Sequence, residues 1–413
     1  MGITINGSSA AGNIDLGTNG TITDLAVGGL PDGTVDGDSV STIPASKLTG
    51  ALPAISGASL TGISSPLSFR NVIINGAMQV SQRGTSETGI SSAGAFRKAP
   101  DRFKFSVDDG TWTVSQDSSG PPGFANSYKV DCTTVDTSIA AGNETTLNYK
   151  AEGQDLQCFC KGTSSAKKFS LQFWVKSNKT GNYAIQMRDQ DNTRHVSHLY
   201  TISSADTWEQ KKIVFPADTT GAFGDDANNS LQLTWFLSVG TNKTSGTMDT
   251  AWASVTDANI AAGQNVNLAD STSNYFNITG IQLEAADACT DFEHRPFGDE
   301  LARCQRYFCK SWNATVAVGT DSGVGVRGYR NNGTARSDMP CDVWFPVEMR
   351  ATPSMTCYNS SSPEAGKVQN GGGTSNFTYW MGLSAKGTYG IGSADNLADG
   401  AWYAFHFTSD AEL

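Results

Sequence analysis

Acidic residues that could serve as a catalytic pair occur at both ends of the central part of the chain. Glu284 and Glu293 are close in sequence, and Asp101 lies far upstream. Two carboxyl groups held on either side of a sugar can hydrolyse a glycosidic bond. Two of these acids, however, have their own cation nearby. Arg102 directly follows Asp101, and Arg295 lies two positions after Glu293. We therefore expect all five residues to form structural ion pairs that tie the first and last strands of one domain together.

Aromatic residues on polar strand faces are the second candidate for chemistry. Strand alternation places Trp174 on the same face as Gln172, opposite an apolar set, and places Trp402 on the same face as His406. A pyranose stacks its C–H face on an indole while neighbouring polar groups bind its hydroxyls. Trp174, Gln172, Trp402 and His406 are therefore candidate glycan contacts. The alternative is that a loop or a neighbouring subunit covers both tryptophans.

Other catalytic and metal-binding patterns are incomplete. Residues 323–328 match G-x-G-x-x-G by letter, but no helix pattern follows them, which argues against a dinucleotide site. His195 and His198 would lie on opposite faces of a strand. The chain has 4 histidines and no G-x-S-x-G sequence, so a Ser-His-Asp triad has little support. Its 8 cysteines lack the two converging pairs of a zinc site. We expect no enzyme activity, no metal and no cofactor.

Charge and hydropathy argue against two classes of partner. The formal net charge of −11 comes without any cluster of lysine and arginine, whereas nucleic-acid binding depends on such clusters. No stretch approaches the roughly 18 apolar residues of a membrane-spanning helix. The N-terminal region also lacks the basic segment and apolar core of a secretion signal. We expect a soluble protein that folds in a cytosol, binds no nucleic acid and does not insert into membranes.

The strands that must position the candidate residues are indicated by alternation of apolar and polar residues. Charged residues make up only 17% of the chain, while glycine, serine, threonine and asparagine are abundant, which favours strands and turns over helices. Period-two runs bounded by turn residues are typical of half-buried antiparallel strands. The sequence therefore predicts an all-β protein with a jelly-roll β-sandwich over residues 66–298. Its clearest runs are 103–107, 169–175, 183–187 and 231–239.

A short helix and a second domain follow the predicted jelly roll. Residues 299–309 place Leu301, Cys304 and Phe308 on one helix face, with acids in the first turn, as the helix dipole favours. This pattern predicts a connecting helix. Residues 310–413 return to strand patterns and predict a smaller C-terminal β-sandwich that forms the tip of the molecule. Its expected strands are 314–318, 342–345, 378–383 and 401–407.

The N-terminal residues 1–65 differ in composition from the rest. The first 62 residues contain no aromatic residue, cysteine or arginine, and the triplet at 48–50 recurs at 60–62 as Leu-Thr-Gly. One such chain buries too little apolar surface to offset its backbone entropy. Three chains wound together can bury the same apolar residues at a shared axis. We expect an extended homotrimeric stem, with a flexible linker as the alternative.

Two parts of the chain resemble bacteriophage proteins. Residues 45–63 (ASKLTGALPAISGASLTGI) resemble the shaft repeats of bacteriophage tail fibres, in which three chains associate side by side. A second set of segments looks like a recurrent module of phage tail-fibre and virion structural proteins, which is similar to the jelly-roll carbohydrate-binding modules of polysaccharide-degrading enzymes. Ala77 and Met78 stand where many such modules have an acidic residue, which argues against a structural calcium. The matching segments, within roughly residues 69 to 308, are 71–84, 99–103, 278–284 and 290–308, the last ending in Cys-Gln-Arg-Tyr-Phe.

The resemblance implies a non-enzymatic, homotrimeric virion fibre protein assembled in the cytoplasm of a bacterial host. The stem would attach to other virion proteins, and the β-domains would bind a host surface glycan or protein. Three heads provide avidity, so a shallow aromatic site would suffice for each. Two alternatives are a purely structural capsid fibre, adaptor or decoration protein, and a surface-polysaccharide depolymerase with carboxylates in a groove.

Overall fold

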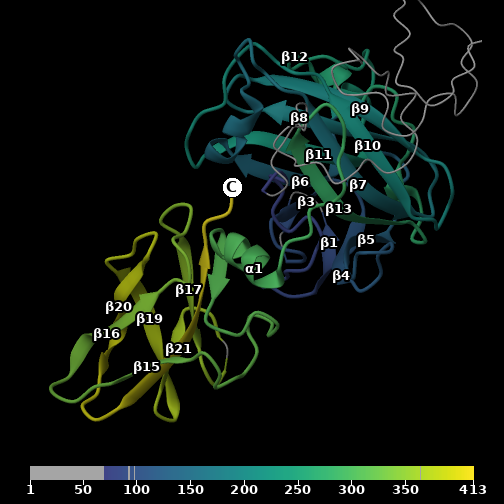
Figure 1. Ribbon diagram of the computed structural model, residues 1–413. Coiled ribbons are helices and arrows are strands. Elements are labelled where there is room, and N and C mark those ends of the chain that lie inside the picture. Colours follow the sequence, from purple (N-terminus) through teal and green to yellow (C-terminus); the bar gives the residue numbers. More distant parts are fainter. Residues whose placement is uncertain (1–68, 92–93, 97, 363) are drawn as a thin grey trace, which may run out of the picture. The chain divides into compact units, whose positions relative to one another are not determined.

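A computed structural model describes residues 69–413, apart from 92–93, 97 and 363 (Figure 1). The predicted stem over residues 1–65, and with it the expected trimer, lies outside the described residues. The described part of the chain is nearly all β, as the alternation predicts, and its strands form two facing sheets followed by a third. It also contains one α-helix and short 3-10 helices at Gly153–Phe159 (η4), Thr241–Lys243 (η5), Asp257–Asn259 (η6) and Leu268–Asp270 (η7).

The two facing sheets form the predicted jelly-roll β-sandwich, and every strand pair in them is antiparallel. The first sheet contains, in spatial order, Ser86–Ser91 (β1), Thr111–Asp117 (β4), Ser127–Thr134 (β5), Tyr275–Ala285 (β13), Phe169–Ser177 (β7) and Glu209–Phe215 (β10). The second contains Ala253–Ser254 (β12), Arg194–Ile202 (β9), Gly181–Asp189 (β8), Asn229–Val239 (β11), Glu144–Glu152 (β6), Phe103–Val107 (β3) and Gly94–Phe96 (β2).

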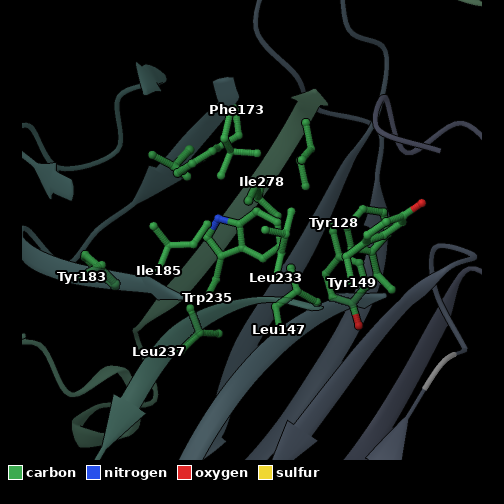
Figure 2. Packing of buried hydrophobic residues seen from close by; sticks show 14 of the residues in the cluster. Tyr128, Leu147, Tyr149, Phe173, Tyr183, Ile185, Leu233, Trp235, Leu237 and Ile278 are labelled. Carbon is green, nitrogen blue, oxygen red and sulfur yellow. The ribbon is translucent and has the colours of Figure 1, made fainter. Parts of the chain in front are cut away.

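The core of the jelly roll lies between the two sheets (Figure 2). Phe173 on β7 packs edge-on against Trp235 on β11, with ring centroids 5.8 Å apart. The alternation that predicted the strands also predicted their buried faces, because the alternating apolar residues expected to face inward on β3, β7, β8 and β11 are, with one exception, buried in this core. Val239 is the exception. A register shift after Phe236 in β11 places Val239 with a separate cluster, in which it packs near Ile260.

Helix α1 (Phe297–Gln305) confirms the predicted helical segment but ends earlier than expected. Asp299 and Glu300 occupy its first turn, as the sequence indicated. Phe308 belongs instead to a short strand, Phe308–Lys310 (β14), which pairs with the end of the chain, Phe308 opposite Asp410. Phe308 and Cys309 are buried, so the contacts of this strand outweigh the helical pattern.

The C-terminal domain is a single antiparallel sheet that folds over its own core. In that core, Tyr403, Phe405 and Phe407 are buried, as their alternation predicted. The sheet contains, in spatial order, β14, Trp402–Asp410 (β21), Lys367–Asn370 (β18), Gly373–Met381 (β19), Gly387–Leu397 (β20) and Arg336–Trp344 (β16). Arg327–Arg330 (β15) and Ser354–Asn359 (β17) also pair with β21.

The expected strand at 314–318 is wrong, because these residues form turns. The N–H of Val316 donates to Asn313 O at 3.0 Å, which closes a tight turn. The ammonium group of Lys310 donates to the carbonyl oxygens of both Ala314 and Val316. A side chain thus satisfies backbone groups that a strand would have paired with a neighbour.

Among the described helices, none is long and apolar enough to cross a membrane.

Candidate functional site

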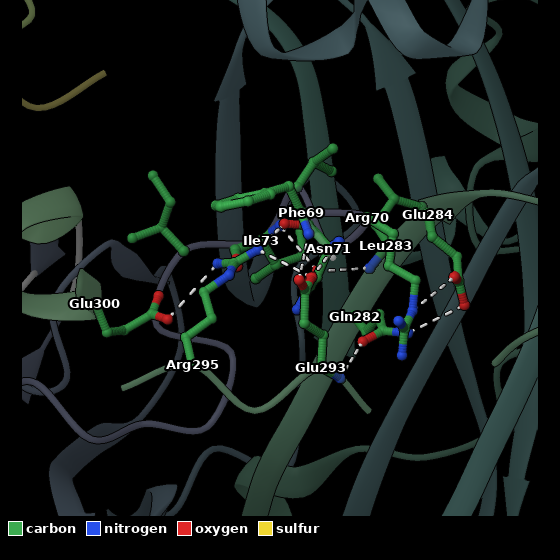
Figure 3. A network of polar contacts seen from close by, with 12 residues as sticks. Phe69, Arg70, Asn71, Ile73, Gln282, Leu283, Glu284, Glu293, Arg295 and Glu300 are labelled. Atoms are coloured by element: carbon green, nitrogen blue, oxygen red, sulfur yellow. Dashed lines mark hydrogen bonds and ion pairs between the residues drawn. The ribbon is translucent and has the colours of Figure 1, made fainter. Parts of the chain in front are cut away.

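The residues predicted to form ion pairs mostly do so, around the first residues of the jelly roll (Figure 3). The carboxylate of Glu293 accepts the N–H of Asn71 at 2.8 Å, and the guanidinium of Arg295 donates to Ile73 O at 3.0 Å. Arg295 also lies 3.6 Å from the carboxylates of both Glu293 and Glu300. These contacts tie the segment after β13 to the segment before β1.

Glu284 pairs with Arg70 at 3.5 Å, and its carboxylate also accepts hydrogen bonds from Thr290. Each of these carboxylates is therefore engaged in a structural contact rather than directed at a substrate. The expected pairing of Asp101 with Arg102 is not observed. Asp101 accepts hydrogen bonds from the backbone and the amide of Gln82, at 2.8 and 2.7 Å. Burial raises the pKa of Asp101 above its ordinary value.

Arg102 instead pairs with Glu412, near the other end of the described chain. The guanidinium also donates to Lys150 O at 2.8 Å and lies 3.3 Å from the ring centroid of Tyr307. Arg102 has a left-handed backbone with φ of 76°. The side chain of residue 102 thus points away from that of residue 101 and connects the jelly roll with the C-terminal domain.

Two of the four predicted glycan contacts are buried. Gln172 is 1% exposed, and its amide donates to Thr290 O at 2.7 Å. His406 is fully buried and stacks on Trp312 with ring centroids 4.0 Å apart. Its Nδ1 lies 2.7 Å from Ser311 Oγ and its Nε2 lies 2.7 Å from Ser322 O. Burial lowers the pKa of His406 below its ordinary value. Because both side chains are buried, neither is available to a ligand. Alternation predicts on which face of a strand a residue lies, but it does not predict the loops that cover that face.

The two predicted tryptophans are both accessible, to different degrees. Trp174 is half-buried, and its indole and the ring of Phe124 both lie close to Gly280. Trp402 is half exposed and lies against the backbone of Gly328 on β15.

Apart from Phe69 at the start of the jelly roll, the most exposed aromatic side chains lie on the C-terminal domain, at positions that the sequence-based predictions did not include. Trp344 on β16, Tyr389 on β20 and Tyr379 on β19 are 71, 57 and 54% exposed. Their strands are neighbours in one sheet (Figure 1). We call these three residues the aromatic face. The sequence signal was present, because Trp344 alternates with the buried Val343 and Phe345.

Two glycines, Gly392 on β20 and Gly382 directly after β19, lie beneath the two tyrosine rings. A Cβ atom at Gly392 would lie 2.3 Å from the ring of Tyr379, and one at Gly382 would lie 2.1 Å from the ring of Tyr389. Any larger residue at either glycine would therefore push the ring off the sheet. Because the rings lie against backbone, they are fixed without being buried, as a stacking surface for a ligand requires.

A pocket of about 150 Å³ opens between Trp344 and Tyr389. Asp342 and Ser384 add polar groups to its lining. Within the described part of the chain, the carboxylate of Asp342 has no hydrogen-bond or ion-pair partner. The hydroxyl of Thr388, by contrast, donates to Met381 O at 2.6 Å. The pocket thus combines aromatic walls with one free carboxylate, a combination suited to binding rather than to paired-carboxylate hydrolysis.

No group of three histidine, cysteine, aspartate or glutamate side chains in the described residues is arranged to hold a metal ion. All eight cysteines are free thiols. The side chains of the aromatic face can supply stacking and hydrogen bonding to a ligand.

No family model and no curated protein matches the chain. Among solved structures, it is similar to the family 11 carbohydrate-binding module of a cellulosomal cellulase from Clostridium thermocellum, with 13% identity, a TM-score of 0.25, and coverage of 50% of this chain and 99% of that one. A family 61 module in complex with β-1,4-galactotriose gives 10% identity, a TM-score of 0.26, and coverage of 52 and 99%. A family 30 carbohydrate-binding module gives 11% identity, a TM-score of 0.27, and coverage of 56 and 95%.

Proposed function

We propose that this protein binds carbohydrate without catalysis, through the aromatic face of its C-terminal domain. The observation that carries the proposal is the arrangement of Trp344 and Tyr389, two exposed rings beside a pocket that contains the free carboxylate of Asp342. Large aromatic side chains are rarely exposed together unless they meet a partner. A sugar suits this site because it presents C–H faces to rings and hydroxyls to a carboxylate.

The charge of the site and of the chain narrows the class of sugar. Asp342 is the one acidic residue among those that line the pocket, and the lining contains no lysine, arginine or histidine. The formal net charge of the whole chain is −11. A negative site on a negative protein repels uronic acids, sialic acids and phosphorylated glycans. The ligand we propose is therefore a neutral glycan.

Replacing Trp344 with alanine is expected to weaken glycan binding by about tenfold or more, because a stacked ring contributes on the order of 1.5 kcal/mol beyond its buried area. Tyr389→Ala should have a similar effect. The measurement is a glycan-array screen with neutral polysaccharides, followed by calorimetric titration of the best ligand. Trp402→Ala is the matched control, since Trp402 is also an exposed tryptophan of the same domain and does not line the pocket. If Trp344→Ala binds as tightly as the unchanged protein, the aromatic face is not the site.

The absence of catalysis is tested on the same ligand. The protein is incubated with the polysaccharide that it binds, and the release of reducing ends is followed over time. We expect no release above the rate of the buffer control. Release that exceeds this rate would favour the depolymerase alternative.

We further propose that the protein is a homotrimeric virion fibre that attaches a bacteriophage to its host, with residues 1–65 as the stem. The support is the resemblance of residues 45–63 to tail-fibre shaft repeats and of the segment ending at Phe308 to virion modules. Three copies of a shallow site give the avidity that each site lacks. Light scattering should report a trimer for the full chain and a monomer for a chain that begins at Pro66. A monomeric full chain would contradict the trimeric stem.

A further inference from the structure

A second and larger pocket lies where the C-terminal domain meets the jelly roll. Its volume is about 450 Å³, within the range of roughly 300 to 1,000 Å³ that is typical of small-molecule sites. Strands β14, β17 and β21 of the C-terminal domain form one side, and Arg83 and Lys98 of the jelly roll contribute to the other. We call this pocket the junction groove. It shares no residue with the pocket beside Trp344.

The floor of the junction groove is a row of hydroxyl groups. Ser354 and Thr356 on β17 lie opposite Asp410 and Thr408 on β21, so all four side chains are on one face of the sheet. Tyr358 follows on the same face. Among the described residues, none of the hydroxyls of Ser354, Thr356, Tyr358 and Thr408 has a hydrogen-bond partner. Thr408 is only 7% exposed but lines the groove, so its hydroxyl is directed to a ligand placed there.

The charged groups in the wall of the groove balance one another. The guanidinium of Arg83 lies 2.9 Å from the carboxylate of Asp410 and 3.4 Å from that of Glu412, and it stacks on the ring of Phe308 at 3.8 Å. Lys98 is the second cation in the lining. Two cations and two carboxylates leave no net charge for an ionic ligand to satisfy. The groove therefore favours a neutral ligand with many hydroxyls.

One end of the groove is held rigid by stacked rings. Trp312 stacks on His406 at 4.0 Å, and Tyr358 packs edge-on against Trp312 at 5.4 Å. The indole N–H of Trp312 donates to Thr320 O at 3.0 Å. Because Tyr358 is fixed by these contacts, little side-chain entropy is lost when a ligand binds beside it. From the unpaired hydroxyls, the balanced charge and the volume, we infer that the junction groove is a second carbohydrate site, which takes a neutral mono- or disaccharide independently of the aromatic face.

The test first removes the rings of the aromatic face, so that any remaining sugar binding can be assigned to the junction groove. In a Trp344→Ala, Tyr389→Ala background, binding of glucose, galactose, mannose, N-acetylglucosamine and their β-linked disaccharides is measured by saturation-transfer NMR and titration. At least one of these sugars should bind. Thr356→Val and Thr408→Val, which remove one hydroxyl each at nearly constant volume, should each weaken its binding about tenfold. Thr378→Val, at an exposed threonine of β19 outside the groove, should leave it unchanged.

Two results would overturn the inference. One is that none of these sugars binds in the background that lacks the aromatic face. The other is that both valine variants bind the sugar as tightly as the background protein, while circular dichroism shows them folded. Either result would leave the proposal for Trp344 and Tyr389 standing, because that proposal is tested in the unchanged groove.

Discussion

Lys161→Met is expected to lower the free energy of unfolding by about 3 to 5 kcal/mol, the cost of leaving the buried carboxylate of Asp189 without its cation. The ammonium group of Lys161 is completely buried, 2.6 Å from Asp189 Oδ2 and 3.0 Å from Asp218 Oδ2. It also donates to the carbonyl oxygens of Thr220 and Gly221, at 3.0 and 2.7 Å. Burial by itself would raise the pKa of Asp218, but the hydrogen bonds from Arg194 and Lys161 outweigh it and lower that pKa.

Urea denaturation followed by circular dichroism measures this loss. Methionine has a similar length and no charge, so the substitution removes the ion pair while largely preserving the packing. Lys168→Met is the matched control, because the Lys168 side chain is half exposed and its partner Asp287 is mostly exposed. The control should change stability by less than about 0.5 kcal/mol. A loss below about 1 kcal/mol in Lys161→Met would show that Asp189 and Asp218 find other partners or take up protons.

Arg102→Met should also cost about 3 to 5 kcal/mol, and it should weaken the attachment of the C-terminal domain to the jelly roll. Both Arg102 and Glu412 are buried, with side chains 1 and 2% exposed. Without Arg102, the carboxylate of Glu412 keeps the longer contact with Arg83, at 3.4 Å. The ring of Tyr307 loses the cation that lies over it.

Hydrogen exchange distinguishes loss of this attachment from general destabilisation. In Arg102→Met, amides in the segment around Asp410 and Glu412 should exchange faster, whereas those in the jelly-roll core around Trp235 should change less. Arg330→Met is the control, at an exposed arginine of β15 in the C-terminal domain. Uniformly faster exchange throughout both domains would contradict a specific role for Arg102 in joining them.

The strands were predictable from the sequence because burial on one face leaves a period-two pattern. Phe103, Phe173 and Trp235 all lie in the predicted core. The prediction failed where a local pattern competed with contacts made far along the chain. Phe308 fits the helical spacing of Leu301 and Cys304 but pairs with Asp410 in a strand instead.

The candidate site was predicted less well, for a related reason. Alternation assigned Trp402 and His406 to one face, but only the structure shows that Trp312 covers His406. Gln172 was expected beside a ligand and instead anchors Thr290 O. Arg102 was expected to pair with its neighbour Asp101, but its positive φ directs it to Glu412, which no sequence spacing indicates. The exposure of a side chain and its pairing with a residue far along the chain depend on how the loops fold. The apolar and polar pattern of a strand carries no information about those loops.

The glycines beneath the tyrosines of the aromatic face have a consequence for how such a surface diversifies. The pose of Tyr379 is set by the bare backbone at Gly392, and that of Tyr389 by the bare backbone at Gly382. A methyl group gained at Gly392 would tilt the ring of Tyr379 without touching the domain core, whereas one at Gly382, where φ is +59°, would also strain the backbone. Ligand preference can therefore drift through single changes on a neighbouring strand, while the residues that contact the sugar stay the same. Variants of this domain that differ in these glycines should recognise different glycans with the same aromatic residues.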